Sequence, residues 1–376
     1  MQIMNYWVMS SNGSRENGVP YWDNTAFGRP QYEVTESLVQ ALNARTLDYY
    51  IYFWDEEPAS SLQTRFDGQL AGIKKDDIVF LQFPVHNSNA YTGYLIDYLH
   101  NQIGAKCVAI IHDITSWQGK KSVKEAREML TDHHSNSFVE HYFLSKMDGL
   151  IVHNHQMAER LQGDFDFAGL EYSNSFVYLD VFGYSAKKNS MDWKRPLKLE
   201  IDFAGNLTKA GFLLGIPSSI AVNVFGREVE TDNVLRDLTT NSYPNINYRG
   251  NYDHEAIPSI LSGSFGLCWA STSYPQITGW SGEYEKYNSP YKAAMYLAAD
   301  EPIIVAKQSA LAEFVEEHGI GLALGDLSKL EVAMRSITKE QYDQMLERTH
   351  QIGNLVRQNF PIKRAAFEMI SNLEWR

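Results

Sequence analysis

The chain has 376 residues, of which 44% are hydrophobic, 13% are aromatic and 21% are charged. This composition is typical of a globular protein, and the length is enough for two domains of ordinary size. The net charge of -13 argues against a nucleic-acid groove as the main binding surface, while a local basic pocket for an anionic ligand stays compatible with it.

The first half of the chain alternates strand and helix patterns. Buried apolar runs predict strands at 3–9, 49–54, 77–83, 106–112 and 149–154. Helical spacing is present at 32–45, 61–73, 90–103, 121–147 and 155–163, and a long polar loop follows the first strand. Apolar strands that alternate with helices predict a parallel sheet with helices on both faces.

After a polar linker at 185–196, the same alternation begins again. It predicts strands at 197–206, 218–226, 246–250, 264–270, 301–306 and 321–325. Helices are expected at 253–262, 289–299, 309–318, 338–356 and 362–374. We therefore expect an α/β protein of two doubly wound, Rossmann-like domains whose strand carboxyl ends face a central cleft. The expected borders are 1–185, 186–356 and a C-terminal helix at 357–376 that packs back on the first domain.

The cysteine and terminal patterns favour an intracellular protein. Cys107 and Cys268 each lie in an apolar run, which predicts two buried thiols. No Cys-X-X-Cys or His-Glu-X-X-His spacing is present, so we expect no metal. The N-terminus lacks a basic segment, and no apolar run approaches the roughly 18 residues of a membrane span. We expect a cytoplasmic protein, and we leave open a peripheral contact with the inner face of the cell membrane.

Histidine and aspartate follow three successive strands of the first half. His86 follows one strand, His112 and Asp113 follow the next, and His153 follows the third. In the functional interpretation, one of His112 and Asp113 contacts a sugar and the other accepts a proton. In the structural alternative, Asp113 caps a helix and His112 is held by a hydrogen bond. A zinc site among the histidines is less favoured because their spacing is irregular.

Two segments of the second half carry cations next to helix starts. In FAGNLTKAG, Gly205 and Asn206 end a strand and Lys209 follows, and glycine lets backbone amides approach an anion. In KYNSPYK, the first turn of the expected helix carries Lys292 beside Tyr291, where the helix dipole favours negative charge. Two cations that converge on helix ends suit a diphosphate.

The residues just before Tyr291 allow a helix cap. Asn288 or Ser289 can provide it, with Pro290 at the first helical position. Both Asn288 and Ser289 are also candidates for contacts with a nucleoside or sugar.

Two further loops are candidates for contacts with a nucleotide or sugar. The Gly-rich stretch 276–286 is either an ordinary surface loop or a lid in which Trp280 or Tyr284 stacks and Glu283 binds hydroxyls. Tyr248 and Arg249 end another strand, in a position from which a base can be contacted.

These segments resemble a known family. The motifs AGNLTK, SFGLCW and SGEYEKYNSPYKAAMYLAADEPIIVAKQSALAEFVEEHGIGLALG are similar to those of bacterial galactofuranosyltransferases that build O-antigen and related surface glycans. LQFP (81–84), IIHDI (110–114) and VHNHQM (152–157) fall in the same order and spacing, so the resemblance covers nearly the whole chain. A more diluted resemblance is to glucosyltransferases of streptococcal serine-rich adhesins. Both imply a GT-B fold, a UDP-sugar donor and no cofactor or essential metal.

The resemblance also implies roles for residues. The second domain binds the donor, with the Gly205–Lys209 turn, Tyr291 and Lys292 at the diphosphate, and the first domain takes the acceptor. The loop around Asn24–Arg29, which includes Phe27 and Gly28, closes on the nucleotide. Many retaining GT-B enzymes carry a glutamate where Lys292 stands here, so ribose binding by that glutamate and a retaining mechanism are not carried over. Relatives also lead us to expect a homo-oligomer.

We expect a hexosyltransferase that moves galactofuranose from a UDP-sugar to a sugar hydroxyl of a growing glycan or glycolipid. If the reaction inverts, Asp113 with His112 is the candidate base. The alternatives are a glucosyl- or N-acetylglucosaminyltransferase acting on a glycosylated adhesin, and a non-catalytic partner that binds sugar nucleotides. A solute-binding protein or an epimerase would share two doubly wound domains. Release of UDP separates an enzyme from a binder.

Overall fold

The structure is a computed structural model that describes residues 4–11, 15–16, 19–20, 28–186, 193–228, 234–239 and 243–374. The chain divides into two compact units. Unit 1 comprises Met1–Leu179 and Pro361–Arg376, and unit 2 comprises Asp180–Phe360. The expected borders lay at 185 and 356, so both differ from the observed ones by a few residues.

Unit 1 is built on a six-stranded sheet in the order β4-β1-β5-β6-β7-β8, and every neighbouring pair is parallel. Its strands are β1 (Tyr6–Ser11), β4 (Arg45–Tyr49), β5 (Ile78–Phe83), β6 (Lys106–Ile111), β7 (Gly149–Val152) and β8 (Ser175–Tyr178). The strand order reverses between β1 and β5, and ligands of open α/β sheets bind at the carboxyl ends beside such a point. A separate antiparallel pair is formed by β2 (Arg15–Glu16) and β3 (Val19–Pro20).

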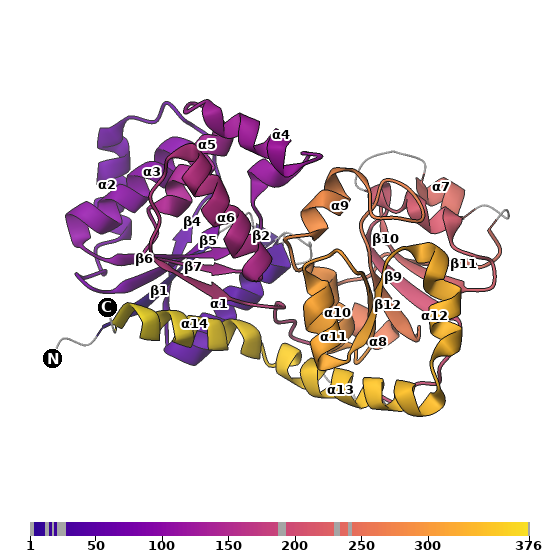
Figure 1. Cartoon of the computed structure of the whole chain (residues 1–376). Coiled ribbons are helices and arrows are strands. Elements are labelled where there is room, and N and C mark those ends of the chain that lie inside the picture. Colours follow the sequence, from indigo (N-terminus) through magenta and orange to yellow (C-terminus); the bar gives the residue numbers. More distant parts are fainter. Residues whose placement is uncertain are drawn as a thin grey trace. The chain divides into compact units, whose positions relative to one another are not determined.

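Helices lie on both faces of this sheet (Figure 1). They are α1 (Gly28–Leu42), α2 (Ala59–Gln69), α3 (Asn89–Asp97), the π-helix η1 (Tyr98–Ile103), η2 (Thr115–Trp117), α4 (Val123–Glu128), η3 (Met129–Thr131), α5 (Asn136–Ser145), α6 (His155–Ala168) and α14 (Phe360–Glu374). Four of them begin where the side chain of Ser88, Ser122, Ser135 or Asn154 accepts a backbone N–H of the first turn.

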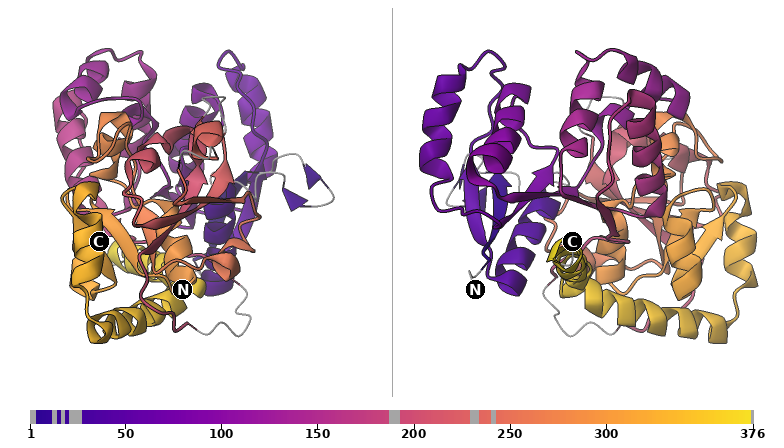
Figure 2. Two further views of the ribbon diagram at one scale, coloured as in Figure 1. Left: turned by 90° about the vertical axis from the view of Figure 1, so that its right-hand side faces the viewer. Right: turned by 60° about the vertical axis from the view of Figure 1, so that its left-hand side comes forward.

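The C-terminal helix α14 lies beside the sheet of unit 1 (Figures 1 and 2). The Nζ of Lys106 donates to the carbonyl oxygen of Leu373 at 2.9 Å, and Arg364 donates to that of Tyr178 at 2.8 Å. Buried Met369 lies so close to Gly149 that a Cβ atom there would collide with it. The end of the chain thus completes the packing of unit 1.

Three expectations for unit 1 were wrong in detail. The strand expected at 49–54 is β4 at Arg45–Tyr49, since only Leu47 and Tyr49 of this edge strand are buried and the aromatic run that follows is a loop. Helix α1 begins at Gly28 and not at 32, so the expected loop around Asn24–Arg29 is helical from Gly28 onward. The long helix expected at 121–147 is broken into α4, η3 and α5 because Ser135 caps a new helix start.

Unit 2 has a second six-stranded sheet in the order β11-β10-β9-β12-β13-β14, again parallel throughout. Its strands are β9 (Glu200–Asn206), β10 (Ala221–Arg227), β11 (Ile246–Gly250), β12 (Phe265–Cys268), β13 (Ile303–Ala306) and β14 (Gly321–Leu324). This is the strand order of a dinucleotide-binding doubly wound sheet, and it reverses between β9 and β12. The prediction of two doubly wound sheets is confirmed.

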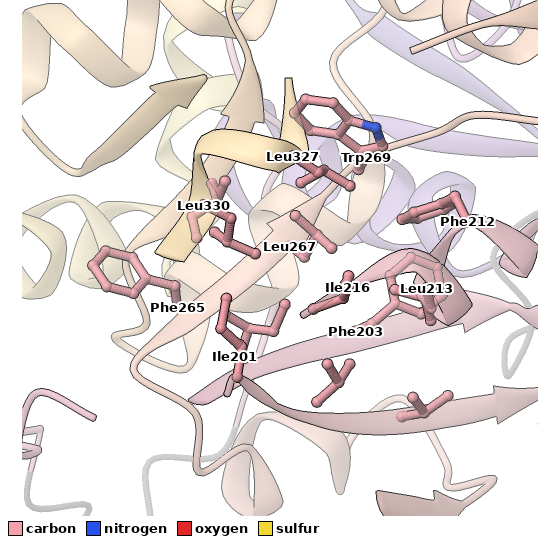
Figure 3. Close-up of a cluster of buried hydrophobic side chains, with 14 of the residues drawn as sticks. Ile201, Phe203, Phe212, Leu213, Ile216, Phe265, Leu267, Trp269, Leu327 and Leu330 are labelled. Atoms are coloured by element: carbon pink, nitrogen blue, oxygen red, sulfur yellow. The ribbon is translucent and has the colours of Figure 1, made fainter. Parts of the chain in front are cut away.

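The core of unit 2 lies between its sheet and the covering helices (Figure 3). Ile201 and Phe203 of β9 pack there with Phe265 and Leu267 of β12 and with Leu330. The helices of unit 2 are η4 (Leu207–Lys209), η5 (Gly211–Gly215), α7 (Val234–Leu238), α8 (Ile257–Ile260), α9 (Gly279–Glu285), α10 (Tyr291–Ala298), α11 (Leu311–His318), η6 (Leu327–Lys329), α12 (Leu330–Ser336) and α13 (Lys339–Arg357). This packing fixes the ends of β9 and β12, where the strand order reverses.

Two expectations for unit 2 were wrong. The stretch 276–286 is largely helix α9, with Ser281, Tyr284 and Glu285 buried. The cap of α10 is Pro290, which makes no side-chain cap hydrogen bond, so neither Asn288 nor Ser289 caps this helix. Pro290 has the extended backbone of a cap residue, and the helix begins at Tyr291.

The burial of the thiols agrees with the sequence. Cys107 and Cys268 are free and buried, as predicted. Among the helices that the structure describes, none is both long enough and apolar enough to cross a membrane.

Candidate active site

The carboxyl end of β9 forms an exposed turn at the point where the sheet of unit 2 reverses its order. Gly205 has a φ of +152°, a backbone conformation that favours glycine. On neighbouring β10, a Cβ atom at Gly226 would lie only 2.0 Å from the carbonyl oxygen of Gly205. Asn206 accepts the backbone N–H of Thr208 at 3.0 Å and so starts the turn η4. Glycine is therefore required on both strands for this turn to form.

Lys292 lies directly beside this turn. A Cβ atom built at Gly205 would be 3.7 Å from the Nζ of Lys292. The same Nζ lies 4.5 Å from the centre of the Phe203 ring, a cation–π distance. Since Phe203 and Gly205 are both on β9, the start of α10 brings its lysine to the carboxyl end of the first strand of the sheet.

Lys209 is the second cation at this place. It ends the turn η4, and its Nζ lies 4.2 Å from the centre of the Trp280 ring on α9. The charge of Lys209 lowers the pKa of Lys292, so the two ammonium groups lie within electrostatic reach of each other. The structure thus brings together Gly205, Lys209 and Lys292, which the sequence had grouped as one diphosphate site.

A buried carboxylate that the sequence reasoning missed accompanies Lys292. Burial lowers the pKa of Lys292, while Cys268 and Glu285 oppose this effect. Burial likewise raises the pKa of Glu285, and Lys292 opposes that shift. Glu285 therefore helps to keep Lys292 charged at the positive end of a helix dipole. In the sequence, Glu285 lies seven residues before Lys292. The two residues belong to different helices, so no helical repeat pairs them.

Tyr291 was also expected at the phosphates, and Ser289 and Asn288 were candidates for contacts with a nucleoside or sugar. The ring of Tyr291 packs against Tyr184 at 5.1 Å and edge-on against Phe182 at 6.0 Å. Ser289 is buried, whereas Asn288 is half-buried. In the part of the chain that the structure describes, the buried Oδ1 atom of Asn288 has no hydrogen-bond donor.

The candidates for base and sugar contacts have different surroundings. Tyr248 is exposed on the edge strand β11 and donates to the carbonyl oxygen of Gly226 at 3.0 Å. Arg249 donates to the Oδ1 of buried Asn223 at 3.1 and 3.2 Å. Tyr248 therefore contacts the turn formed by β9 and β10, whereas the side chain of Arg249 contacts β10 three residues before that turn.

Of the three α9 residues expected at the sugar nucleotide, two are half-buried and one is buried. Tyr284 is buried, so its ring cannot serve as an exposed stacking surface, which excludes this one of the two expected stacking rings and leaves Trp280. Glu283 is half-buried and forms an ion pair with Lys286 at 2.6 Å. The accessible aromatic ring of α9 is the half-buried Trp280.

In unit 1, His112 is held as a neutral ring. Its Nε2 lies 2.9 Å from the Oε1 of Gln82, whose amide nitrogen donates to the carbonyl oxygen of Met9 and to Thr35. Burial, with smaller contributions from His153 and His86, lowers the pKa of His112 to about 3. A histidine with so low a pKa is a poor proton acceptor near neutral pH.

Asp113 follows His112 without serving as a helix cap. The short helix η2 begins at Thr115, and the carboxylate of Glu140 accepts the backbone N–H groups of Thr115 and Ser116, both at 2.8 Å. Glu140 therefore satisfies this helix start, and the alternative interpretation of Asp113 as a cap was wrong. Asp113 is half-buried at the carboxyl end of β6.

The loop expected to close on the nucleotide is described only in part. Phe27 lies outside the described residues. Gly28 and Arg29 are buried in the first turn of α1, where Arg29 pairs with Glu33 at 2.7 Å.

One cluster in the described residues has ligand types suited to a metal ion. A nitrogen of His100, the sulfur of Cys107 and an oxygen of Asp148 lie within 4.8 Å of one another. Asp148 accepts the backbone N–H of Cys107 at 2.7 Å and lies 3.0 Å from the Nε2 of His100. These hydrogen bonds are enough to explain why the three residues lie together at the amino end of β6. The cluster includes none of the histidines that the sequence analysis grouped.

Two family models match the chain. The N-terminal domain of a glucosyltransferase 3-like family matches residues 19–164, and its C-terminal domain matches residues 201–369. The first match lies within unit 1, and the second covers most of unit 2 and extends into the part of α14 that belongs to unit 1.

Curated relatives match over most of their length. The beta-1,6-galactofuranosyltransferase WbbI of Escherichia coli (strain K12) is 25% identical over 309 residues, which cover 82% of this chain and 83% of that protein. Glucosyltransferase 3 of Streptococcus gordonii is 23% identical over 350 residues, which cover 90% and 92%.

Among solved structures, Alr3699/HepE of Anabaena, crystallised with UDP-glucose, superposes with a TM-score of 0.55 and 11% identity over 100% of each chain. At this identity the likeness concerns the fold, which is the GT-B fold that the sequence led us to expect.

Proposed function

Because the chain belongs to the glucosyltransferase 3-like family, we propose that it transfers galactofuranose from UDP-galactofuranose to a sugar hydroxyl of a growing surface glycan. The similarity to the galactofuranosyltransferase of Escherichia coli supports this choice of sugar. Glucosyltransferase 3 of Streptococcus gordonii matches a larger share of the chain, and this observation favours glucose from UDP-glucose as the second candidate.

The observation that carries the donor site is the cluster of Gly205, Lys209 and Lys292. The anomeric carbon–oxygen bond breaks in the reaction, and its electron pair leaves with the β-phosphate of UDP. Two ammonium groups beside an exposed glycine turn would stabilise this developing negative charge. The cation–π contact with Trp280 fixes the side chain of Lys209 before the donor binds. We infer that this charge stabilisation occurs without a metal ion or another cofactor.

The surroundings of Lys292 also explain how the fold tolerates a half-buried cation at this place. Glu285 supplies a partial counter-charge, and its own pKa is raised by burial. Binding of a diphosphate would add further negative charge near Lys292 and raise the pKa of the lysine. Glu285 would then no longer be the main partner of Lys292.

On the acceptor side, we assign Asp113 as the base if the reaction inverts the anomeric centre. Asp113 would take the proton of the acceptor hydroxyl while its oxygen attacks the anomeric carbon. Burial disfavours the imidazolium that His112 would become on taking this proton, and lowers its pKa to about 3. We give His112 the role of a neutral hydrogen-bonding group beside Asp113, oriented by Gln82.

The decisive test of the donor site is Lys292→Ala, with UDP binding measured by calorimetry. The expected result is loss of detectable binding. The matched control is Lys329→Ala, which removes an exposed lysine of unit 2 outside this cluster and should leave UDP affinity unchanged. UDP binding by Lys292→Ala that equals that of the wild type would refute the diphosphate assignment.

The sugar is identified by a donor screen. UDP-galactofuranose, UDP-glucose and UDP-N-acetylglucosamine are each incubated with octyl galactoside and octyl glucoside as acceptors, and the linkage of the product is determined. Release of UDP with UDP-galactofuranose alone supports the proposal. Release with UDP-glucose alone supports the second candidate, and release with none of the three donors indicates a non-catalytic binder.

A further inference from the structure

A second feature of unit 1, apart from the histidines and Asp113, is a run of exposed aromatic rings directly after β4. We call residues 50–57 the aromatic loop. The exposed fractions are 75% for Tyr50, 75% for Phe53 and 50% for Trp54. Single exposed apolar residues are ordinary, but three large rings gathered in one short segment mark an interaction surface.

The start of the aromatic loop is held by the segment that follows β5. The side-chain amide of Asn87 donates to the carbonyl oxygen of Tyr50 at 3.0 Å. Asp55 accepts the backbone N–H of Asn89 at 2.7 Å, at the amino end of α3. The middle of the loop is thus tied to the start of a helix on the same unit.

The end of the aromatic loop is held by α2. The buried carboxylate of Glu57 accepts the hydroxyl of Ser61 at 2.9 Å and pairs with Arg65 at 2.6 Å. The ring of Tyr52 packs edge-on against Tyr91 at 5.9 Å and takes the guanidinium of Arg65 over its face at 4.8 Å. Tyr52 and Glu57 therefore fix the backbone of the aromatic loop, and the other three rings of the loop are exposed to solvent.

The aromatic loop lies at the same end of the sheet as the candidate base. Parallel strands end at one edge, so the residues after β4, β5 and β6 share that edge. Asn87, which holds the loop, is next to His86 in sequence, and the charge of His86 affects the pKa of His112. The exposed rings therefore lie at the same edge of the sheet as His112 and Asp113.

The charged side chains around the aromatic loop indicate which kind of molecule can bind to it. Asp48, Asp55 and Glu56 are exposed beside the rings. They would repel an anionic membrane surface, and a second copy of this loop would bring carboxylates against carboxylates. An uncharged sugar suits both features, because its C–H faces stack on aromatic rings while its hydroxyls donate to carboxylates.

Resting on the proposed function, we propose that the aromatic loop is an acceptor subsite. It binds neutral sugar units of the acceptor that lie beyond the hydroxyl presented to Asp113. Phe53 and Trp54 supply stacking surfaces, and Asp55 and Glu56 accept hydrogen bonds from hydroxyls.

The test uses the full chain and the double variant Phe53→Ser, Trp54→Ser. The matched control is Phe367→Ser, an exposed phenylalanine on α14 of the same unit. Binding of cellotetraose, maltotetraose and lacto-N-tetraose is measured by saturation-transfer NMR without any donor, and UDP affinity is measured separately. We expect the wild type and the control to bind at least one tetrasaccharide, and the double variant to bind it about tenfold more weakly or not at all. UDP affinity should be the same in all three.

Several results would overturn the proposal. One is a wild-type protein that binds none of the tetrasaccharides, and another is a double variant that binds them as the wild type does. Dissociation of an oligomer in the double variant, seen by sedimentation velocity, would identify the loop as a contact between copies. Loss of binding to phosphatidylglycerol vesicles would identify it as a membrane contact. Because sugar binding is measured without donor, failure of the donor-site assignment would appear only in the UDP experiment.

Discussion

The histidine group of unit 1 gives a pH dependence whose sign and size follow from the structure. His153 is buried at the end of β7, with its Nε2 3.1 Å from the carbonyl oxygen of Ile111. Burial lowers its pKa from 6.5 to about 4, although the carbonyl partially opposes this shift. The folded chain therefore holds the ring neutral in a pH range where the unfolded chain protonates it.

The sign follows from proton binding. Between pH 6.5 and about 4 the unfolded state binds more protons than the folded state, so stability falls as the pH falls through this window. The size follows from RT times the logarithm of the ratio of the proton-binding polynomials of His153 in the unfolded and folded states. At pH 5.5 His153 lowers the free energy of unfolding by about 1.4 kcal/mol, and at pH 7.5 by about 0.1 kcal/mol or less. His112, with a pKa of about 3, adds a loss of similar size.

The perturbation is His153→Gln, which keeps an N–H donor for Ile111 and removes the titrating group. The assay is urea unfolding at pH 7.5, 6.5 and 5.5, followed by tryptophan fluorescence. The variant should lose about 1.4 kcal/mol less free energy of unfolding than the wild type between pH 7.5 and 5.5. The control His134→Gln, at an exposed histidine of the same unit, should keep the wild-type dependence. Equal losses in wild type and His153→Gln would refute the reasoning.

Three further predictions concern unit 2. Glu285→Gln should move the alkaline limit of UDP binding to lower pH, because Glu285 raises the pKa of Lys292; calorimetric profiles that superimpose on the wild type would contradict this. Gly226→Ala should lower the free energy of unfolding, measured by urea titration, by about 1–3 kcal/mol. The added Cβ atom would lie 2.0 Å from the carbonyl oxygen of Gly205, and Gly226 has a φ of +133°. In the control Gly211→Ala, the Cβ atom meets no atom within 4 Å, so the free energy of unfolding should change little. Burial and Asp202 raise the pKa of Glu301, so the wild type loses stability as the pH rises from about 4.5 through the raised pKa. Glu301→Gln removes this titrating group, so its free energy of unfolding should fall less than that of the wild type between pH 5 and 9. Urea titrations that show the same fall in both proteins would argue against this prediction.

Strand positions were predictable where burial was complete. Strand β5 is buried along its whole length and β6 is buried except for the half-buried Lys106, and their apolar runs marked both strands within one residue. The edge strand β4 was misplaced because its aromatic neighbours Tyr50, Phe53 and Trp54 imitate a buried run while lying in solvent. Local composition records which residues are apolar, and only packing decides which of them are covered.

Helix boundaries show the same division. The caps at Ser88 and Asn154 place α3 and α6 where a local hydrogen bond can be read from residue type. Helix α9 could not be foreseen, because glycine at 279 and 282 lowers helix propensity, and burial of Tyr284 and Glu285 overrides that preference.

The sequence alone determined two parallel sheets, the glycine turn after β9, and the presence of one lysine just after that turn and another at a helix start. These follow from local rules of period, backbone freedom and charge. Only the tertiary structure decided that Lys292 has Glu285 near its ammonium group, that Trp280 holds Lys209, and that Glu140 relieves Asp113 of a capping role. Each of these arrangements involves residues from separate elements. The distances between such residues depend on how the helices pack on the sheet, and the spacing of residues in the sequence does not show them.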